Sequence, residues 1–162
     1  MNQNSIYCIF CESSEESKVE AFLKGLGFNV ISALAERNVF KNGKWIKEFR
    51  SIIPGYVFFE NNCEPDWEKI SENKHIYYPL QYLDKSKKLR ENDLVFVKWL
   101  KKYNGKIKIS KAIENGNKIE IIKGPLMGMD KKMVKINKRQ KCMGIKMEGE
   151  GLNNIIWLSY EM

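Results

Sequence analysis

Two cysteines three positions apart are the first residues whose types and spacing could support chemistry. Cys8 and Cys11 form a C-x-x-C pair, a spacing found in zinc sites and redox-active disulfides. The run from Ile6 to Cys11 is apolar and favours a buried strand, in which the two thiols point to opposite faces. No second cysteine pair or histidine pair follows. We therefore predict that this pair binds no metal and carries no redox chemistry.

The remaining chemically capable residues form no catalytic pattern. His75 is the only histidine, and no nucleophile motif lies near it. The sequence has no glycine loop that could cradle a phosphate and no paired acid–base motif. We predict that the protein is not an enzyme and uses no cofactor.

The size and composition set the class of protein. At 162 residues and 43% hydrophobic content, the chain can form one ordinary domain or two small ones. Its first five residues lack the basic start and apolar run of a signal peptide. No stretch approaches the roughly 20 apolar residues of a membrane span. With only four cysteines, the sequence favours a reduced, cytoplasmic protein without a membrane partner.

The positive charge is concentrated in one segment. The net charge is +8, and residues 98–141 carry 14 Lys and Arg against 3 Asp and Glu, whereas residues 1–97 carry 13 against 14. Such a block favours a polyanionic partner, with nucleic acid ahead of an anionic membrane. The alternative is that these lysines only keep the protein soluble.

The stretch from Ile52 to Glu60 predicts a central strand. Its residues Tyr56 to Phe59 are all β-branched or aromatic, and Pro54 and Gly55 mark its start. Tyr56 and Phe58 share one face and Val57 and Phe59 share the other. Because both faces are apolar, both must be covered, either by helices of this chain or by a partner.

A basic hairpin is predicted before this strand. Its turn is Asn42-Gly43, which suits a type I′ turn, and its arms mix Lys and Arg with Phe40, Trp45 and Phe49. The hairpin could contact a nucleic-acid backbone. The alternative is a hairpin charged for solubility.

The other elements predict an α+β protein of two domains. Apolar spacing predicts helices between Ser13 and Gly27 and at residues 64–70 and 91–102. It predicts strands at 6–11, 29–34 and 76–78, and these elements together form an α/β sandwich over residues 1–103. Ser13 and Glu16 have the spacing of a capping box at the start of the first helix. Residues 104–115 are expected to be a basic linker, with a short strand at 107–109. Several short strands between glycine-rich turns predict a small β-barrel at 116–162.

Motifs in both halves resemble known families. Gly116 to Ile121, Gly124 to Gly128 and Val134 to Arg139 resemble a KOW domain. Tyr7 to Phe10 and Ile53 to Phe59 resemble the N-terminal domain of the NusG/RfaH-type transcription elongation and antitermination factors. In this order the motifs cover nearly the whole chain, and its lysine-rich second half is most similar to the specialised LoaP-type paralogues.

The sequence departs from the family pattern at two positions. Ile6 stands where a tryptophan is usual, and Lys131 stands where a glycine usually follows the Gly-Pro pair. In RfaH the second domain can switch to a helical hairpin. Residues 116–162 are rich in Gly and Ile here, so we predict only β structure for them.

The resemblance implies that the first domain binds RNA polymerase, at the clamp helices of its largest subunit. The residues that match the family motif, or that share a strand face with it, form the expected polymerase-binding set: Phe10, Ile53, Pro54, Tyr56 and Phe58. Aromatic side chains on one strand face could accept an apolar ridge of the partner. The alternative is that these rings are ordinary core.

The resemblance also implies that the second domain binds nucleic acid, in LoaP-type factors a hairpin in the nascent RNA leader. The expected RNA-binding set comprises the basic residues around the turns of the barrel and in the linker: Lys106, Lys108, Lys111, Lys123, Lys131, Lys132, Lys135, Lys138, Arg139 and Lys141. These favour phosphates, and Arg139 could also bind a guanine edge.

The predicted function is therefore a monomeric transcription elongation and antitermination factor that binds polymerase and a nascent RNA hairpin. Upstream DNA is a further possible partner. The alternatives are a general NusG-type factor linking polymerase to ribosomal protein S10, and a ribosome-associated KOW protein.

Overall fold

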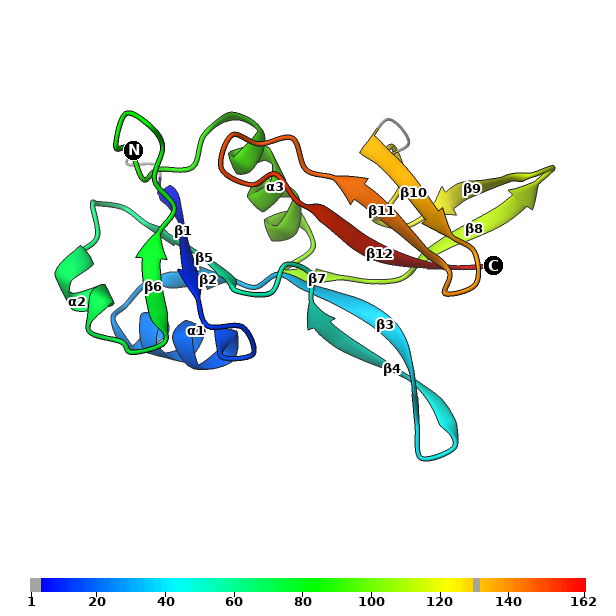
Figure 1. Cartoon of the computed structure of the whole chain (residues 1–162), viewed down its shortest axis with the longest axis horizontal. Helices are drawn as coiled ribbons and strands as arrows, with labels where there is room; N and C mark the ends of the chain where they lie inside the picture. Colours follow the sequence, from blue (N-terminus) through cyan, green and yellow to red (C-terminus); the bar gives the residue numbers. More distant parts are fainter. Residues whose placement is uncertain (1–3, 130–131) are drawn as a thin grey trace. The chain divides into compact units, whose positions relative to one another are not determined.

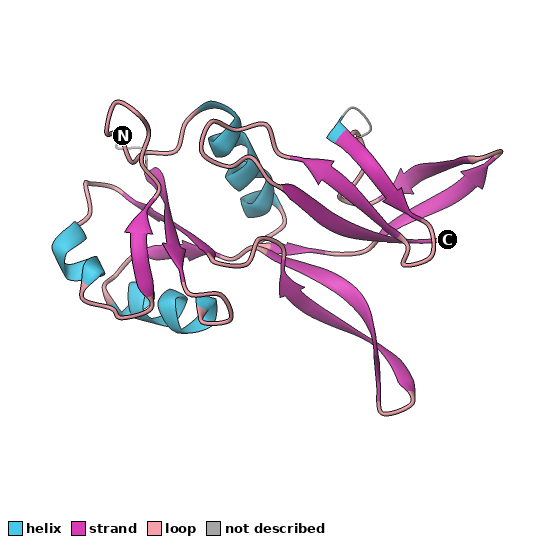
Figure 2. Cartoon of the chain, viewed as in Figure 1, coloured by secondary structure: helices cyan, strands magenta, loops and turns pink. Residues whose placement is uncertain are grey.

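A computed structural model describes residues 4–129 and 132–162. The described residues form two compact units, and each unit draws on several separate stretches of the chain. Unit 1 comprises the described residues up to Ala33 together with Ile53–Gly105 and Gly149–Leu152. Unit 2 comprises Leu34–Ile52, Asn153–Met162 and the described residues of Lys106–Glu148. The fold class is α+β, as predicted, and Figure 2 shows the helices and strands. The helices α1, α2 and α3 belong to unit 1.

Unit 1 is built on a four-stranded antiparallel sheet in the order β2-β5-β1-β6 (Figure 1). These strands are β1 (Ser5–Cys11), β2 (Asn29–Ile31), β5 (Tyr56–Asn61) and β6 (Ile76–Pro79). The two strands that are apolar on both faces, β1 and β5, are the central pair. Their sequences suit this position because a central strand is covered on both faces.

Helices cover both faces of this sheet. They are α1 (Glu16–Gly25), α2 (Trp67–Ser71) and α3 (Glu91–Lys102). One face packs Tyr7, Ile9 and Phe59 against Leu23 of α1 and Ile70 of α2. On the other face, the ring of Phe58 meets Phe96 of α3, with centroids 6.0 Å apart. The sheet therefore fills the middle layer of a sandwich.

The start of α1 differs from the predicted capping box. The residue before the helix is Glu15, and no side chain caps the first turn. The carboxylate of Glu16 instead accepts a hydrogen bond from the backbone N–H of Gly55, at 2.8 Å. The Glu16 carboxylate therefore binds the turn before β5 and does not cap the first turn of α1.

Unit 2 contains a three-stranded sheet in the order β4-β3-β7. Its strands are β3 (Leu34–Lys41), β4 (Lys44–Ser51) and β7 (Lys106–Ile107). The hairpin β3–β4 turns at Asn42 and Gly43, whose φ angles of 51° and 74° are both positive, as a type I′ turn requires. The predicted hairpin is therefore present.

Unit 2 also contains a five-stranded sheet in the order β10-β11-β12-β8-β9. Its strands are β8 (Ser110–Asn115), β9 (Lys118–Lys123), β10 (Met133–Asn137), β11 (Cys142–Lys146) and β12 (Ile155–Glu161). Lys138, just after β10, donates from Nζ to the carbonyl of Asn117, just before β9, at 3.1 Å. The sheet is thus curled until its two edge strands approach each other at one end. Alternate residues of β12, Ile156, Leu158 and Tyr160, are buried.

The segment 104–115, expected as a linker, contains β7 and β8. β8 pairs with both β9 and β12, so it is part of the five-stranded sheet. Its buried residues are the small Ser110 and Ala112, while its larger residues are exposed. The strand therefore lacks the hydrophobic alternation that would have distinguished it from a linker. Division of the chain at residues 103 and 116 stays a prediction.

Candidate functional site

Three rings from neighbouring strands form an aromatic cluster on one face of the unit 1 sheet. Phe10 of β1 is opposite Tyr56 of β5 and Tyr78 of β6 in the strand register. Its ring centroid lies 4.7 Å from that of Tyr56 and 5.0 Å from that of Tyr78. Phe10 and Tyr56 are half-buried and Tyr78 is 59% exposed. The cluster is therefore held by three adjacent strands and still reaches solvent.

Two residues of the expected polymerase-binding set are not at the surface. Phe58 shares the face of Phe10 and Tyr56, but it is fully buried because Phe96 of α3 covers it. Ile53 is 3% exposed. These two side chains support the surface from below, while Phe10, Pro54 and Tyr56 reach solvent.

The Pro54-Gly55 turn fixes the start of β5 beside the aromatic cluster. Gly55 has a φ of 86°, and its carbonyl accepts a hydrogen bond from the N–H of Cys11 at 2.9 Å. A Cβ at Gly55 would lie 3.3 Å from the Cys11 carbonyl oxygen. The turn therefore needs glycine for both its conformation and its close approach to β1.

A hollow of about 470 Å³ adjoins the aromatic cluster within unit 1. Phe10 and Tyr78 line one part of it and Leu80, Glu150 and Gly151 line another. The hollow is open, and its lining mixes apolar rings with a carboxylate and backbone groups. This surface could accept an apolar side chain of a partner that also carries polar groups.

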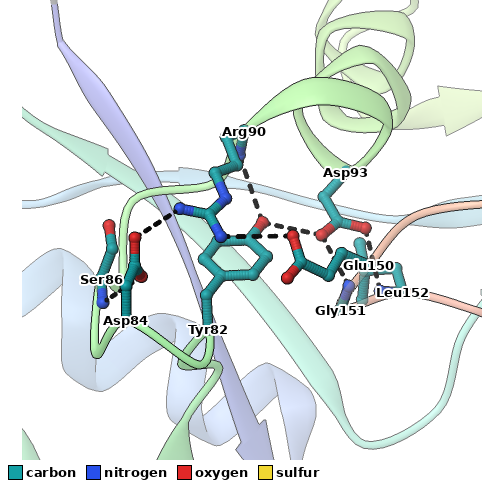
Figure 3. A network of polar contacts seen from close by, with 8 residues as sticks. All are labelled: Tyr82, Asp84, Ser86, Arg90, Asp93, Glu150, Gly151 and Leu152. Atoms are coloured by element: carbon teal, nitrogen blue, oxygen red, sulfur yellow. Dashed lines mark hydrogen bonds and ion pairs between the residues drawn. The ribbon is translucent and has the colours of Figure 1, made fainter.

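A network around Asp93 holds the wall of this hollow. Asp93, on the first turn of α3, is 1% exposed, and its carboxylate accepts three hydrogen bonds (Figure 3). The donors are the N–H of Gly151 at 2.9 Å, the N–H of Leu152 at 2.9 Å and the hydroxyl of Tyr82 at 2.7 Å. A buried carboxylate needs such donors, because burial without them is costly. Burial and the bond to Asp93 together raise the pKa of Tyr82, so this hydroxyl stays a donor.

Arg90 joins the same network from the solvent side. Its guanidinium donates to Asp84 at 2.9 Å and to Glu150 at 3.2 Å, and it lies 4.1 Å from the ring centroid of Tyr82 (Figure 3). The ion pairs lower the pKa of Asp84 and raise that of Arg90. Glu150, which lines the hollow, is thereby held in place.

The second expected set consists of basic residues of unit 2. Lys131 lies outside the described residues. The other nine are all exposed: Lys106, Lys108, Lys111, Lys123, Lys132, Lys135, Lys138, Arg139 and Lys141.

The fold brings some of these basic residues together and separates others. Lys111 of β8 and Lys123 of β9 are directly opposite in the strand register. Like charges in that position repel each other, so an anion between them would be stabilising. Lys138 lies beside the turn that precedes β9. Lys106, by contrast, belongs to the three-stranded sheet, where its Nζ lies 5.4 Å from the ring centroid of Phe49.

Two residues of these surfaces, Tyr78 and Lys118, were not predicted from the sequence. Tyr78 completes the aromatic cluster. The sequence feature that could have identified it is its place in an apolar run after a polar loop. Lys118 begins β9 next to the turn that Lys138 contacts, and it is exposed. Its basic character was visible, but only the curl of the sheet puts it near Lys138.

The cysteine pair has the geometry that its strand predicts. Cys11 lies in the core beneath α1, whereas Cys8 lies on the opposite face of β1, and both are buried free thiols. Among residues 4–129 and 132–162, no cluster of three or more potential metal ligands occurs.

A family model described as "Transcription termination factor nusG" matches residues 4–98, more than half of the chain. The chain belongs to the NusG family. NusG-family proteins are non-enzymatic transcription factors that act with RNA polymerase in elongation and termination, so this chain is a transcription factor of that kind.

A solved structure of a NusG protein is similar over most of its length. It is described as "Domain interaction in Thermotoga maritima NusG", and it shares 18% sequence identity with a TM-score of 0.49. The likeness covers 97% of this chain and 94% of that chain. A search of curated proteins by sequence finds no match. In the described part of the chain, no helix is long and apolar enough to cross a membrane.

Proposed function

We propose that this NusG-family protein is a processive antitermination and elongation factor. Unit 1 binds RNA polymerase at the clamp helices of the largest subunit, and the basic five-stranded sheet of unit 2 binds a hairpin of nascent RNA. Holding the clamp keeps polymerase in a pause-resistant state, and RNA binding raises the local concentration of the factor at chosen operons. This division of roles is that of a LoaP-type specialised factor.

The observation that carries the polymerase contact is the half-exposed cluster of Phe10, Tyr56 and Tyr78 beside an open hollow. Rings that are fixed by three strands lose little freedom on binding, and such aromatic anchors dominate many interfaces. An apolar ridge of a helical partner fits a surface of this kind.

Replacement of Tyr78 by alanine tests the polymerase contact. We expect Tyr78→Ala to weaken binding to core RNA polymerase about 30-fold, equivalent to about 2 kcal/mol, because an anchoring ring is lost. Tyr77→Ala is the matched control, since Tyr77 is the preceding residue of the same strand, is 63% exposed and points to the other face. Binding is measured by titration with labelled protein. Equal affinities of the two folded variants would contradict the assignment of this face.

The RNA contact is supported by the exposure of the nine described basic residues and by the opposed Lys111–Lys123 pair. Lysine spreads charge over phosphates, and Arg139 adds a fork of donors for a base edge. A regular A-form major groove is too narrow for side chains, so base-specific contact needs a loop, bulge or opened groove.

A salt titration and a double variant test the RNA contact. If about five phosphates are neutralised, the slope of log affinity against log salt is expected to lie near −3.5 to −4.5. Lys138→Ala with Arg139→Ala should make that slope shallower by about 1.5 and should remove the crosslinks of the protein to its RNA targets in cells. Lys74→Ala with Lys88→Ala, two exposed lysines of unit 1, removes the same charge and should change neither. A slope near zero for the wild-type protein would exclude the electrostatic contact and favour ribosomal protein S10 as the partner of unit 2.

A further inference from the structure

The hollow beside the aromatic cluster combines aromatic rings with a carboxylate. Phe10 and Tyr78 line one part of it, and Glu150 lines another. Tyr78 is 59% exposed and the side chain of Glu150 is 47% exposed, so both are open to a partner. Leu80, which is buried, adds an apolar group to the same lining. Aromatic faces and carboxylates both attract cations, and here they share one hollow.

Close packing of the two flanking glycines fixes the backbone on either side of Glu150. A Cβ at Gly149 would overlap the carboxylate of Asp93, and a Cβ at Gly151 would lie 2.8 Å from Cδ1 of Leu80. Asp93 cannot easily move aside, because it is buried and accepts three hydrogen bonds. Glu150 is therefore the residue of this short stretch whose side chain has room to reach the hollow.

The polar network beside the hollow contains more acidic than basic groups. Asp84, Asp93 and Glu150 supply carboxylates to it, and Arg90 supplies a guanidinium (Figure 3). Arg90 is shared between Asp84 at 2.9 Å and Glu150 at 3.2 Å, and all three side chains are partly exposed. Exposed ion pairs of this kind are weak. A carboxylate also has several acceptor positions, so Glu150 can bind a second cation beside Arg90.

We propose that this hollow binds an arginine side chain of RNA polymerase and that Glu150 selects it. The inference rests on the proposed function, because it names one polar contact of the polymerase that unit 1 binds. A guanidinium is planar, so it can stack on the ring of Tyr78 or Phe10 while it donates to Glu150. A lysine ammonium is a point charge and cannot stack in this way. Glu150 repels phosphates, so the hollow disfavours nucleic acid.

Two matched small probes test the arginine site without polymerase. N-acetyl-arginine amide carries the guanidinium, and N-acetyl-citrulline amide has nearly the same shape with a neutral urea group. Each probe is titrated to millimolar concentration into the isotope-labelled full-length protein, and the amide signals are followed by NMR. The arginine probe should shift the amide signals of Tyr78 and Gly151, and Glu150→Gln should abolish these shifts. Equal shifts with the citrulline probe, or unchanged shifts in Glu150→Gln, would overturn the proposal.

Polymerase binding separates this inference from the proposed function. Glu150→Gln should weaken binding of the full-length protein to core RNA polymerase about 10-fold, because a hydrogen bond between charged groups is lost. Glu150→Asp keeps the charge and should lose less affinity. Glu68→Gln is the matched control, since Glu68 is an exposed acidic residue of α2 in unit 1, and its affinity should stay within twofold of wild type.

The two polymerase contacts can fail separately. If Tyr78→Ala weakens polymerase binding and Glu150→Gln binds like wild type, the arginine site is wrong and the proposed polymerase contact stands. If Glu68→Gln loses as much affinity as Glu150→Gln, the effect is one of overall charge and the arginine site is wrong. If neither Tyr78→Ala nor Glu150→Gln weakens binding, the proposed polymerase contact fails together with the arginine site.

Discussion

At the scale of single residues, burial governs the protonation of the Cys8 and Cys11 thiols. Burial raises the pKa of Cys11 to about 11 and holds that of Cys8 well above its ordinary value. The thiolate is the form that attacks disulfides and binds metals, and a raised pKa keeps both thiols in the protonated form at neutral pH. Their odd spacing on one strand places the two thiols on opposite faces. Because the strand is buried, both thiols stay protonated.

The raised pKa of Cys11 predicts a dependence of stability on pH. The folded protein keeps this proton at pH values where the unfolded chain loses it, so the stabilisation is complete below about pH 9 and is lost as the pH rises towards 11. Between pH 7.5 and 10.5, the free energy of unfolding of wild type should fall about 2 kcal/mol more than that of Cys11→Ala. Urea unfolding measures both. Cys63→Ala, at an exposed cysteine, should track wild type. Parallel pH profiles for wild type and Cys11→Ala would contradict this.

At the level of single residues, the candidate surface was predictable only where strand alternation determines which face of the sheet a side chain occupies. The common face of Phe10, Tyr56 and Phe58 follows from alternation and register, and the structure has it. The burial of Phe58 was not predictable, because it depends on where Phe96 of a distant helix packs. Tyr78 was missed for the same reason: its neighbour in space is 68 positions away in the sequence.

At the scale of elements, a helix or strand was predicted correctly where its hydrophobic periodicity is strong and was missed where that periodicity is weak. Helix α3 occupies residues 91–102 as predicted, because its apolar residues recur at helical spacing and its acidic residues precede its basic ones. Strand β8 was missed as a strand, because only Ser110 and Ala112 of it are buried. A strand that buries small residues shows little contrast between its faces.

Two glycine replacements, one at a crowded turn and one at an open helix end, test how backbone conformation and packing stabilise unit 1. Gly55→Ala should destabilise the protein by about 1–2 kcal/mol, because alanine is strained at a φ of 86° and its Cβ would crowd the Cys11 carbonyl. Gly25→Ala, at the end of α1 with no atom within 4 Å of the added Cβ, should stabilise it by about 0.5 kcal/mol. Thermal or urea unfolding measures both changes. Destabilisation by both replacements would show that crowding and backbone strain at Gly55 are not the cause of the stability loss in Gly55→Ala.

At the scale of the whole molecule, neither unit is a continuous stretch of the chain. Residues 34–52 and 53–105 belong to different units, and Gly149–Leu152 belongs to unit 1 although its flanking residues belong to unit 2. Hydrophobic periodicity along the sequence indicates single helices and strands. It does not indicate which distant segments pack into the same unit. The sequence pattern gave no sign that the β3–β4 hairpin belongs to unit 2 or that residues 149–152 belong to unit 1.

Replacement of Asp93 tests the contact that brings Gly149–Leu152 into unit 1. Asp93→Ala leaves the N–H groups of Gly151 and Leu152 and the hydroxyl of Tyr82 without their acceptor, so we expect a loss of about 1–3 kcal/mol in unfolding free energy. Amide hydrogen exchange at Gly151 and Leu152 should become faster. Asp84→Ala removes an exposed partner of Arg90 and should cost less than about 1 kcal/mol. Unchanged exchange at residues 151 and 152 in Asp93→Ala would contradict the role of Asp93.

The late position of Gly149–Leu152 in the sequence also bears on how the protein is made. Synthesis proceeds from the N-terminus, so the sheet and helices of unit 1 leave the ribosome well before Gly149–Leu152. In this segment Gly151 and Leu152 donate to Asp93, and Glu150 and Gly151 line the hollow. A nascent chain that has just exposed α3 carries an acidic group without these backbone donors. The aromatic surface therefore acquires its final wall only after residues 149–152 have left the ribosome.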